Sequence, residues 1–213
     1  QNEIDFRYSD PLTAADNTLT FQAVVKTVAE RNGLYADFSP KPLRHQPGNG
    51  FHINISVKGG NCEDPLSHMI AGILAHISEL TVFLNPTVAS YERFGGPKAP
   101  EYISWSNQNR SQLIRVPAAV DAYRRAELRS PDPTTNPYLA FALLIYAGLD
   151  GIQQKLPLPA PTDLNLFTAS ADILAGLQRL PLTLREAATL AANSSFVSQY
   201  LPKTIVQTYY NQR

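Results

Sequence analysis

The stretch AELRSPDPTTNPYLAFALLIYAGLDGI, residues 126–152, joins a strand pattern to a helix pattern across a short turn. In an extended chain, side chains alternate between the two faces. This alternation places Arg125, Glu127 and Arg129 on one face and Ala126 and Leu128 on the other. Because the chain has no net charge, the alignment of arginine, glutamate and arginine on one face of a strand requires a specific explanation.

The second half of the stretch predicts a buried helix. Asn136 and Pro137 supply a helix cap and a first-turn proline, and the run YLAFALLIYAGL from Tyr138 to Leu149 is continuously apolar. That run is too short to cross a bilayer, so it is interpreted as a core helix and no membrane span is indicated.

The same cap recurs upstream. Asp10 and Pro11 precede apolar residues at helical spacing that end at Gly33, and Asp64 and Pro65 precede a second such series. The second series contains His68 and His76, which are interpreted as structural residues. Near the end, a capping box is expected at Thr183 and Glu186.

Between the helices, several segments have strand patterns. GFHINISV alternates Phe51, Ile53, Ile55 and Val57 with polar residues, while SQLIRVP and the opening QNEIDFRYSD also favour strands. No repeats or linkers are evident. The sequence therefore predicts one α+β unit, an antiparallel sheet with helices packed on one side.

Composition excludes several classes of protein. With 213 residues, 44% apolar content and 18 basic against 18 acidic residues, the chain is expected to be globular, without the overall charge that attracts nucleic acid or an anionic membrane. Cys62 is the single cysteine, so an internal disulfide is impossible, which suits the cytoplasm. The N-terminus has no initiator Met and no signal pattern, and the chain is expected to begin within a domain.

The polar faces of the expected strands carry unusual residue types. A face that only meets solvent is normally rich in Lys, Thr and Gln, and that remains one interpretation of each strand. Carboxylates and imidazole can instead hold a divalent metal, and arginines recognise phosphate and carboxylate. The residues concerned are Glu3, His52, Arg115, Arg125, Glu127 and Arg129.

The loop KPLRHQPGNG before this strand adds Gly48 and Gly50, which would allow a ligand to approach the backbone closely, although a simple turn explains them equally well. From these motifs the chain resembles the C-terminal part of the glutamine synthetase family. The resemblance rests on Lys41-Pro42 with GNGFH and Ser56, on NRSQLIRVP, on residues 126–152, and on QNEIDFRYSDPLTAADN, all in order along the chain. It implies that residues 1–213 are the C-terminal portion of one catalytic domain, with the family's N-terminal domain absent.

The resemblance also implies site residues. Metal ligands for Mg²⁺ or Mn²⁺ would be Glu3, His52 and Glu127. Gly48, Arg93 and Arg129 would bind glutamate, and Ser56, Arg110, Arg115 and Arg125 would contact ATP. Arg93 and Arg110 would be the catalytic residues.

The activity implied is ATP-dependent formation of a γ-glutamyl amide from glutamate and ammonia through an acyl phosphate. The intact protein would be a cytoplasmic homo-oligomeric ring, and this chain alone would be inactive. One position departs from the family pattern: in RFGGPKAP, Lys98 stands where a flap glutamate that binds ammonium is expected. A cation would repel ammonium. The alternatives are therefore a γ-glutamyl-polyamine or γ-glutamyl-amine ligase, or a catalytically silent regulatory or structural subunit.

Overall fold

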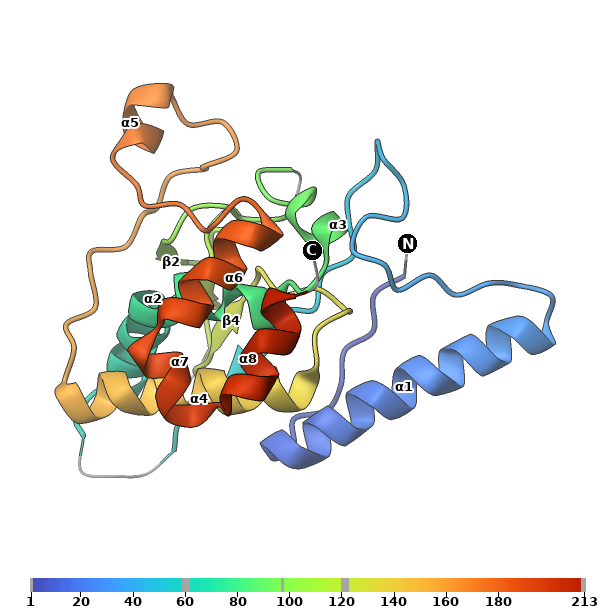
Figure 1. Ribbon diagram of the computed structural model, residues 1–213. Helices are drawn as coiled ribbons and strands as arrows, with labels where there is room; N and C mark the ends of the chain where they lie inside the picture. Colours follow the sequence, from blue (N-terminus) through green and yellow to red (C-terminus); the bar gives the residue numbers. More distant parts are fainter. Residues whose placement is uncertain (1, 59–61, 97, 120–122, 212–213) are drawn as a thin grey trace.

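The computed structural model describes residues 2–58, 62–96, 98–119 and 123–211. A short four-stranded sheet lies among helices that cover its apolar face (Figure 1). The strands are β1 Ile53–Ile55, β2 Trp105–Asn107, β3 Ile114–Val116 and β4 Ala126–Leu128. The helices are α1 Pro11–Arg31, α2 Pro65–Leu84, α3 Val88–Tyr91, α4 Pro137–Gln154, α5 Ala171–Ala175, α6 Leu184–Asn193, α7 Ser195–Tyr200 and α8 Lys203–Tyr210.

The sheet has the strand order β1-β4-β3-β2, and β4 pairs antiparallel with both of its neighbours. The predicted α+β class is confirmed, while the pair β2–β3 is parallel, so the sheet is mixed rather than antiparallel throughout. Three apolar residues, Ile53, Leu128 and Ile114, align across the strands and belong to the core. One residue away, Glu127 lies between Asn54 and Arg115 on the opposite face.

The core is centred on α2 and α4, which pack against each other at very short range. A Cβ on Gly72 would lie 2.1 Å from the Ala147 carbonyl oxygen, and one on Gly151 would lie 2.1 Å from that of His68. Only glycine permits this approach of two backbones. By length and composition α2 is also apolar enough to cross a membrane, but 67% of its most apolar window is buried inside the protein, as expected of a core helix.

The helix starts follow the predicted caps. Asp10 accepts a hydrogen bond from Thr13 N, Asn136 accepts from Tyr138 N and Leu139 N, and both helices have proline in the first turn. The Thr183 hydroxyl accepts from Glu186 N, while the Glu186 carboxylate accepts from Leu182 N. These side chains satisfy backbone groups that a helix N-terminus leaves unpaired.

The predicted opening strand is not formed. Residues 2–10 have no strand assignment and run as an irregular segment to α1 (Figure 1). A strand requires a neighbour to complete its backbone hydrogen bonds, and β1 pairs only with β4 among the described strands. Aromatic contacts hold this segment instead: Phe6 packs edge-to-face on Phe21 at 5.3 Å, and Phe21 packs on Phe38 at 6.1 Å.

Candidate active site

Glu127 is the centre of the candidate site. It lies on β4, one of the two inner strands of the sheet, and only 7% of its surface is exposed. Its Oε1 accepts a hydrogen bond from Arg129 Nη1 at 3.0 Å and lies 3.2 Å from His52 Nδ1. Its Oε2 forms an ion pair with Arg115 Nε at 2.7 Å, although neither atom makes a well-aligned hydrogen bond. Four residues predicted for the site, from β4, from β3 and from the approach to β1, therefore meet at one carboxylate.

The surroundings keep Glu127 ionised. Burial by itself raises the pKa of the carboxyl, but the hydrogen bond to His52 and the charges of Arg129 and Arg115 outweigh burial and lower that pKa to about 2. The partners are affected in turn, since burial lowers the pKa of Arg129 and the nearby charges of Arg115 and Arg110 lower it further, against the effect of Glu127. The cluster is thus an anion held by cations, with a surplus of positive charge beside it.

Arg93 and the glycine turn form a second part of the site. Arg93 lies just beyond α3 and is 3% exposed. A Cβ on Gly48 would lie 2.7 Å from Arg93 Cγ, and a Cβ on Gly50 would lie 2.9 Å from His52 Nε2 and 3.3 Å from Arg93 Nη2. The two glycines therefore leave room for the Arg93 side chain against the loop, and they bring it next to His52. The structure brings Gly48, Arg93 and His52 together, while their roles at glutamate and metal stay predictions.

The residues predicted for the nucleotide lie around this centre. Arg125 precedes β4, and its Nε donates to Asn54 Oδ1 at 3.0 Å. Arg110 is exposed in the loop before β3, and its charge is close enough to act on Arg129. Ser56 directly follows β1 and is half-buried. Their arrangement leaves cationic groups along one side of the sheet, while their individual roles at ATP stay predictions.

Glu3 is not part of this cluster. It is exposed in the irregular N-terminal segment, and within residues 2–58, 62–96, 98–119 and 123–211 no group of three or more His, Cys, Asp or Glu side chains could hold a metal ion. The donors that do meet, His52 and Glu127, are of the types that bind divalent metals. Arg115 and Arg129 already balance the charge of Glu127. His52 and Glu127 therefore fit a metal ion only as part of a larger site, to which further carboxylates must contribute. The role of Glu3 stays a prediction.

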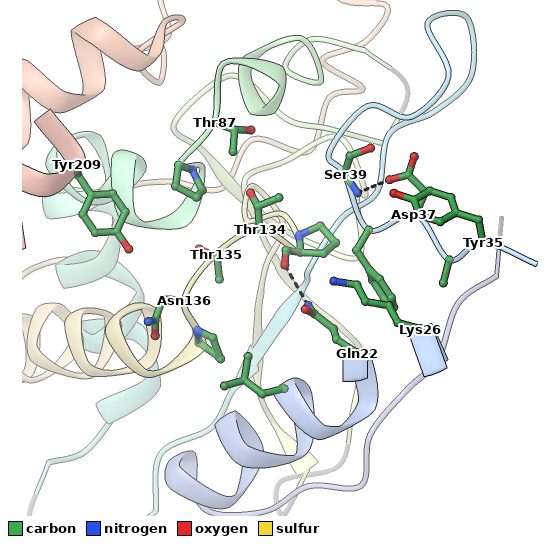
Figure 2. Close-up of a pocket in the computed structure, with 16 residues that line it drawn as sticks. Gln22, Lys26, Tyr35, Asp37, Ser39, Thr87, Thr134, Thr135, Asn136 and Tyr209 are labelled. Atoms are coloured by element: carbon green, nitrogen blue, oxygen red, sulfur yellow. Dashed lines mark hydrogen bonds between the residues drawn. The ribbon is translucent and has the colours of Figure 1, made fainter. Parts of the chain in front are cut away.

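A pocket of about 680 Å³ lies elsewhere, between α1, residues 35–39 and the turn before α4. Figure 2 shows Gln22 and Lys26 of α1 facing Thr134 and Thr135 across this space, with Gln22 donating to the Pro133 carbonyl. None of the predicted site residues lines it. We place the candidate site at the charged cluster, because that is where residues capable of binding phosphate, carboxylate and metal converge.

In the segment predicted to be the flap, described residues on either side of position 97 have left-handed backbone conformations. Gly95 and Lys98 have φ angles of 72° and 68°, and a Cβ on Gly95 would lie 2.2 Å from Glu101 Oε2. Lys98 is exposed, and Glu101 is paired with Arg179 at 3.3 Å. The acidic group that meets this loop is therefore Glu101, which already has a cationic partner.

Sequence reasoning missed the support beneath Arg93. Its Nη1 donates to the Ser130 carbonyl and lies 3.9 Å from a carboxylate oxygen of Asp132, which is fully buried. Asn85, at the end of α2, donates to both the Ser130 carbonyl and Asp132. The signal in the sequence was an aspartate between two prolines in SPDP, which reads as a turn and gives no indication of a buried charge.

Comparisons with known proteins agree on a family. The family model described as glutamine synthetase, catalytic domain, matches residues 1–213. The glutamine synthetase of Methanosarcina mazei is 45% identical over 98% of this chain and 50% of its own length, and that of Clostridium saccharobutylicum is 43% identical over 98% and 51%. A solved GmaS/ADP complex, in its conformation 1, is 31% identical with a TM-score of 0.85, covering 96% of this chain and 50% of that one. The chain therefore spans about half the length of these relatives.

Proposed function

The chain belongs to the glutamine synthetase family, and from that premise we propose that it supplies part of the active site of an ATP-dependent ligase joining glutamate to ammonia or another amine. The structural observation that supports this most strongly is the buried Glu127 carboxylate in contact with His52, Arg115 and Arg129. Glutamine synthetases are glutamate–ammonia ligases, and the solved GmaS structure was obtained with ADP. Both support the proposal that this chain takes part in nucleotide binding.

The proposed reaction has two steps. A side-chain carboxylate oxygen of glutamate attacks the γ-phosphorus of ATP, so that an O–P bond forms, the bond to ADP breaks and an acyl phosphate results. The amine nitrogen then attacks the acyl carbon, phosphate leaves, and the amine loses a proton. Charge on the transferred phosphoryl group must be neutralised in the first step, and water must be kept from the acyl phosphate in the second.

The residues of this chain divide between those needs. Arg110 and Arg115 would neutralise phosphate oxygens, with Arg125 and Ser56 holding the rest of the nucleotide. Arg93 and Arg129 would hold the carboxylates of glutamate, and the backbone at Gly48 would contact it. His52 and Glu127, joined by Glu3, would hold Mg²⁺ or Mn²⁺, which when bound supplies further positive charge at the phosphates.

The experiment that tests this proposal measures phosphate release from ATP by the full-length protein that contains this chain. Reactions omit in turn the metal ion, glutamate and the amine. We expect release only when Mg²⁺ or Mn²⁺, glutamate and ammonia or another amine are all present. Release that does not depend on glutamate would show an ATPase of another kind, and absence of both release and nucleotide binding would favour a silent regulatory or structural subunit.

Lys98 favours a second candidate acceptor. The ammonium ion that a glutamate at this flap position would attract is repelled by an exposed lysine, and Glu101 is occupied by Arg179. A larger amine with an apolar or extended body would depend less on that single charge. A panel of ammonia, methylamine and polyamines in the same assay separates the two candidates: turnover with ammonia supports a glutamine synthetase, and turnover only with larger amines supports a γ-glutamyl-amine ligase.

Location and assembly are part of the proposal. A single cysteine is compatible with the reducing cytoplasm. A homo-oligomeric ring would cover apolar surface that this chain leaves exposed, such as Leu12, Leu19, Val24 and Val28 on α1. Sedimentation of the full-length protein would test assembly, and a monomer at assay concentration would contradict it.

A further inference from the structure

A buried acidic residue that the proposed mechanism does not use lies beneath Arg93. Asp132 follows β4 in the turn before α4 and has 0% exposure. One carboxylate oxygen accepts hydrogen bonds from the backbone N of Thr134 at 2.9 Å and from the Thr134 hydroxyl, and the other accepts from Asn85 Nδ2 at 3.0 Å. A carboxylate removed from water requires such partners and a compensating positive charge.

The compensating charge belongs to Arg93. Arg93 Nη1 lies 3.9 Å from the Asp132 oxygen that also binds Asn85, and it donates to the Ser130 carbonyl at 3.0 Å. Burial lowers the pKa of Arg93, and the charge of Asp132 acts in the opposite direction. In the described residues this pair is the deepest of the ion pairs, with side chains 2% and 0% exposed.

Asn85 connects the parts of this network. As the residue that ends α2, it donates through Nδ2 to the Ser130 carbonyl at 2.9 Å and to Asp132, so it fixes both acceptors that face Arg93. The Asp132 backbone N also donates to the Leu84 carbonyl at 3.2 Å. The end of the core helix α2 therefore sets the position of the groups that bind the Arg93 guanidinium.

We infer that Asp132, held by Asn85 and Thr134, is a positioning residue that fixes the Arg93 guanidinium beside the Gly48–Gly50 turn, and so sets the affinity for the carboxylate of the substrate. This inference rests on the proposed function, in which Arg93 binds glutamate. A guanidinium anchored on one nitrogen keeps its remaining N–H groups aimed in a fixed direction. Asp132 also neutralises Arg93 when no substrate carboxylate is present, so that a buried arginine is tolerated in the empty site.

The kinetic test uses the full-length protein and the variant Asp132→Asn, which keeps the shape and removes the charge. We expect the KM for glutamate to rise about ten- to a hundredfold, while kcat changes less than about twofold and the KM for ATP is unchanged. Asp163→Asn, which removes an exposed carboxylate, is the matched control and should leave all three values unchanged. An unchanged KM for glutamate in Asp132→Asn, or equal effects on glutamate and ATP, would overturn the inference.

A double-mutant cycle separates positioning from general destabilisation. In an Arg93→Lys background the ammonium lacks the guanidinium geometry, so Asp132→Asn should raise the KM for glutamate much less than it does in the wild type. Thermal unfolding of each variant reports damage to the fold. An equal effect of Asp132→Asn in both backgrounds would show that it acts by another route.

Crystal structures of the variants test whether Asp132 positions Arg93 without any measurement of activity. In crystals of the full-length protein, Asp132→Asn should displace the Arg93 guanidinium from the Ser130 carbonyl, whereas Asp163→Asn should not. If Arg93 keeps its position in Asp132→Asn, the inference is wrong whatever the protein catalyses. If Arg93 moves but the wild type never uses glutamate, the proposed function fails while the positioning of Arg93 by Asp132 stands.

Discussion

At the scale of single residues, Glu127 has a structural role in addition to the chemical role proposed for it. Its carboxylate compensates two guanidinium groups, those of Arg115 and Arg129, on a strand buried on both faces. Removing one member of a buried ion pair leaves the others unpaired and costs about 3–5 kcal/mol. Glu127→Ala would therefore also damage the fold, and a variant of the same shape is the better probe of chemistry.

We predict that Glu127→Gln in the full-length protein lowers metal-dependent phosphate release by about 100-fold or more, because the amide is a poorer ligand and leaves the arginines uncompensated. The matched control is Glu30→Gln on the exposed surface of α1, which should keep the wild-type rate. Phosphate release and thermal unfolding are measured on both. A wild-type rate in Glu127→Gln would remove this residue from the site.

A second residue-scale prediction concerns Arg129, whose Nη1 donates to Glu127 Oε1. Arg129→Lys keeps the charge but loses the forked geometry that binds carboxylate. We expect the KM for glutamate to rise about ten- to a hundredfold with the KM for ATP nearly unchanged. If the affinity for ATP alone changed in steady-state kinetics, the assigned role of Arg129 would be wrong.

At the scale of elements, the contact of α2 with α4 positions the buried network beneath Arg93. The reason is that α2 ends at Asn85 and α4 follows the turn that carries Asp132. Histidine also joins these helices. His76 of α2 binds Glu79 of the same helix at 2.6 Å and Asp150 of α4 at 2.9 Å, and its ring stacks on Phe196 of α7 at 3.8 Å. The structural interpretation of this histidine is confirmed.

The glycines of this contact give a stability prediction. Gly72→Ala or Gly151→Ala would place a methyl group within the space of a backbone carbonyl, so we expect the free energy of unfolding to fall by about 3 kcal/mol. Gly176→Ala is the control, because its Cβ would meet only the Ile173 carbonyl at 3.6 Å. It should change stability by less than about 0.5 kcal/mol in chemical denaturation. Equal stability of Gly72→Ala and Gly176→Ala would refute the close packing.

The His76 cluster gives a pH prediction. Burial lowers the pKa of His76, but the hydrogen bonds and charges of Glu79 and Asp150 outweigh burial and raise it. A raised pKa means that the imidazolium stabilises the fold fully below its unfolded pKa of about 6.5, and that this stabilisation is lost as the pH rises through the folded pKa.

His76→Gln should therefore lower the free energy of unfolding by about 1–2 kcal/mol at pH 6 and by less at pH 9. The exposed His45→Gln is the control and should follow the wild type at both pH values. Denaturation curves across this range measure the difference. The same loss at both pH values would show that the charge of His76 contributes nothing.

The sequence predicted those elements that depend on local residues, and it missed those that depend on contacts with distant segments. Helix starts at Asp10, Asp64, Asn136 and Thr183 depend on local caps, and all four were predicted. β2 was missed, and its parallel pairing with β3 was not foreseen, since neither follows from local pattern. The strand expected near Glu3 had the right alternation, but alternation does not supply a neighbouring strand.

At the scale of the whole molecule, the chain spans about half the length of the relatives it matches. Among its first thirty-five residues, many apolar side chains are exposed to solvent. These include Ile4, Phe6, Tyr8, Leu34 and Tyr35. Figure 1 shows α1 projecting from the remaining helices. An exposed apolar surface of this kind is typical of a face that contacts further protein.

We therefore predict that the chain tested alone does not release phosphate from ATP, whatever metal and amine are added. At the candidate site, the described residues bring together His52 and Glu127 as possible metal ligands, with cations beside them and Glu3 apart from them. The measurement is the assay used for the full-length protein. Turnover by the 213-residue chain would contradict the prediction.

The candidate site was predictable from the sequence only in part. Resemblance to the family identified Gly48, His52, Arg93, Glu127 and Arg129, and the structure brings these together. The resemblance could not reveal Asp132 or Asn85, because their contacts with Arg93 depend on burial and on the meeting of distant segments. The role of Glu3 requires partners beyond those described, so the family relationship now supports the ligase proposal more strongly than the expected three-ligand cluster does.

The measurement that tests the central claim most directly follows the oxygen atoms. Glutamate labelled with ¹⁸O in its side-chain carboxylate is given to the full-length protein with ATP, Mg²⁺ and the preferred amine, and the released phosphate is analysed by mass spectrometry. Because phosphate leaves with the carboxylate oxygen that attacked ATP, we predict that each phosphate carries one ¹⁸O atom. Unlabelled phosphate, released at the same rate with or without glutamate, would contradict the account.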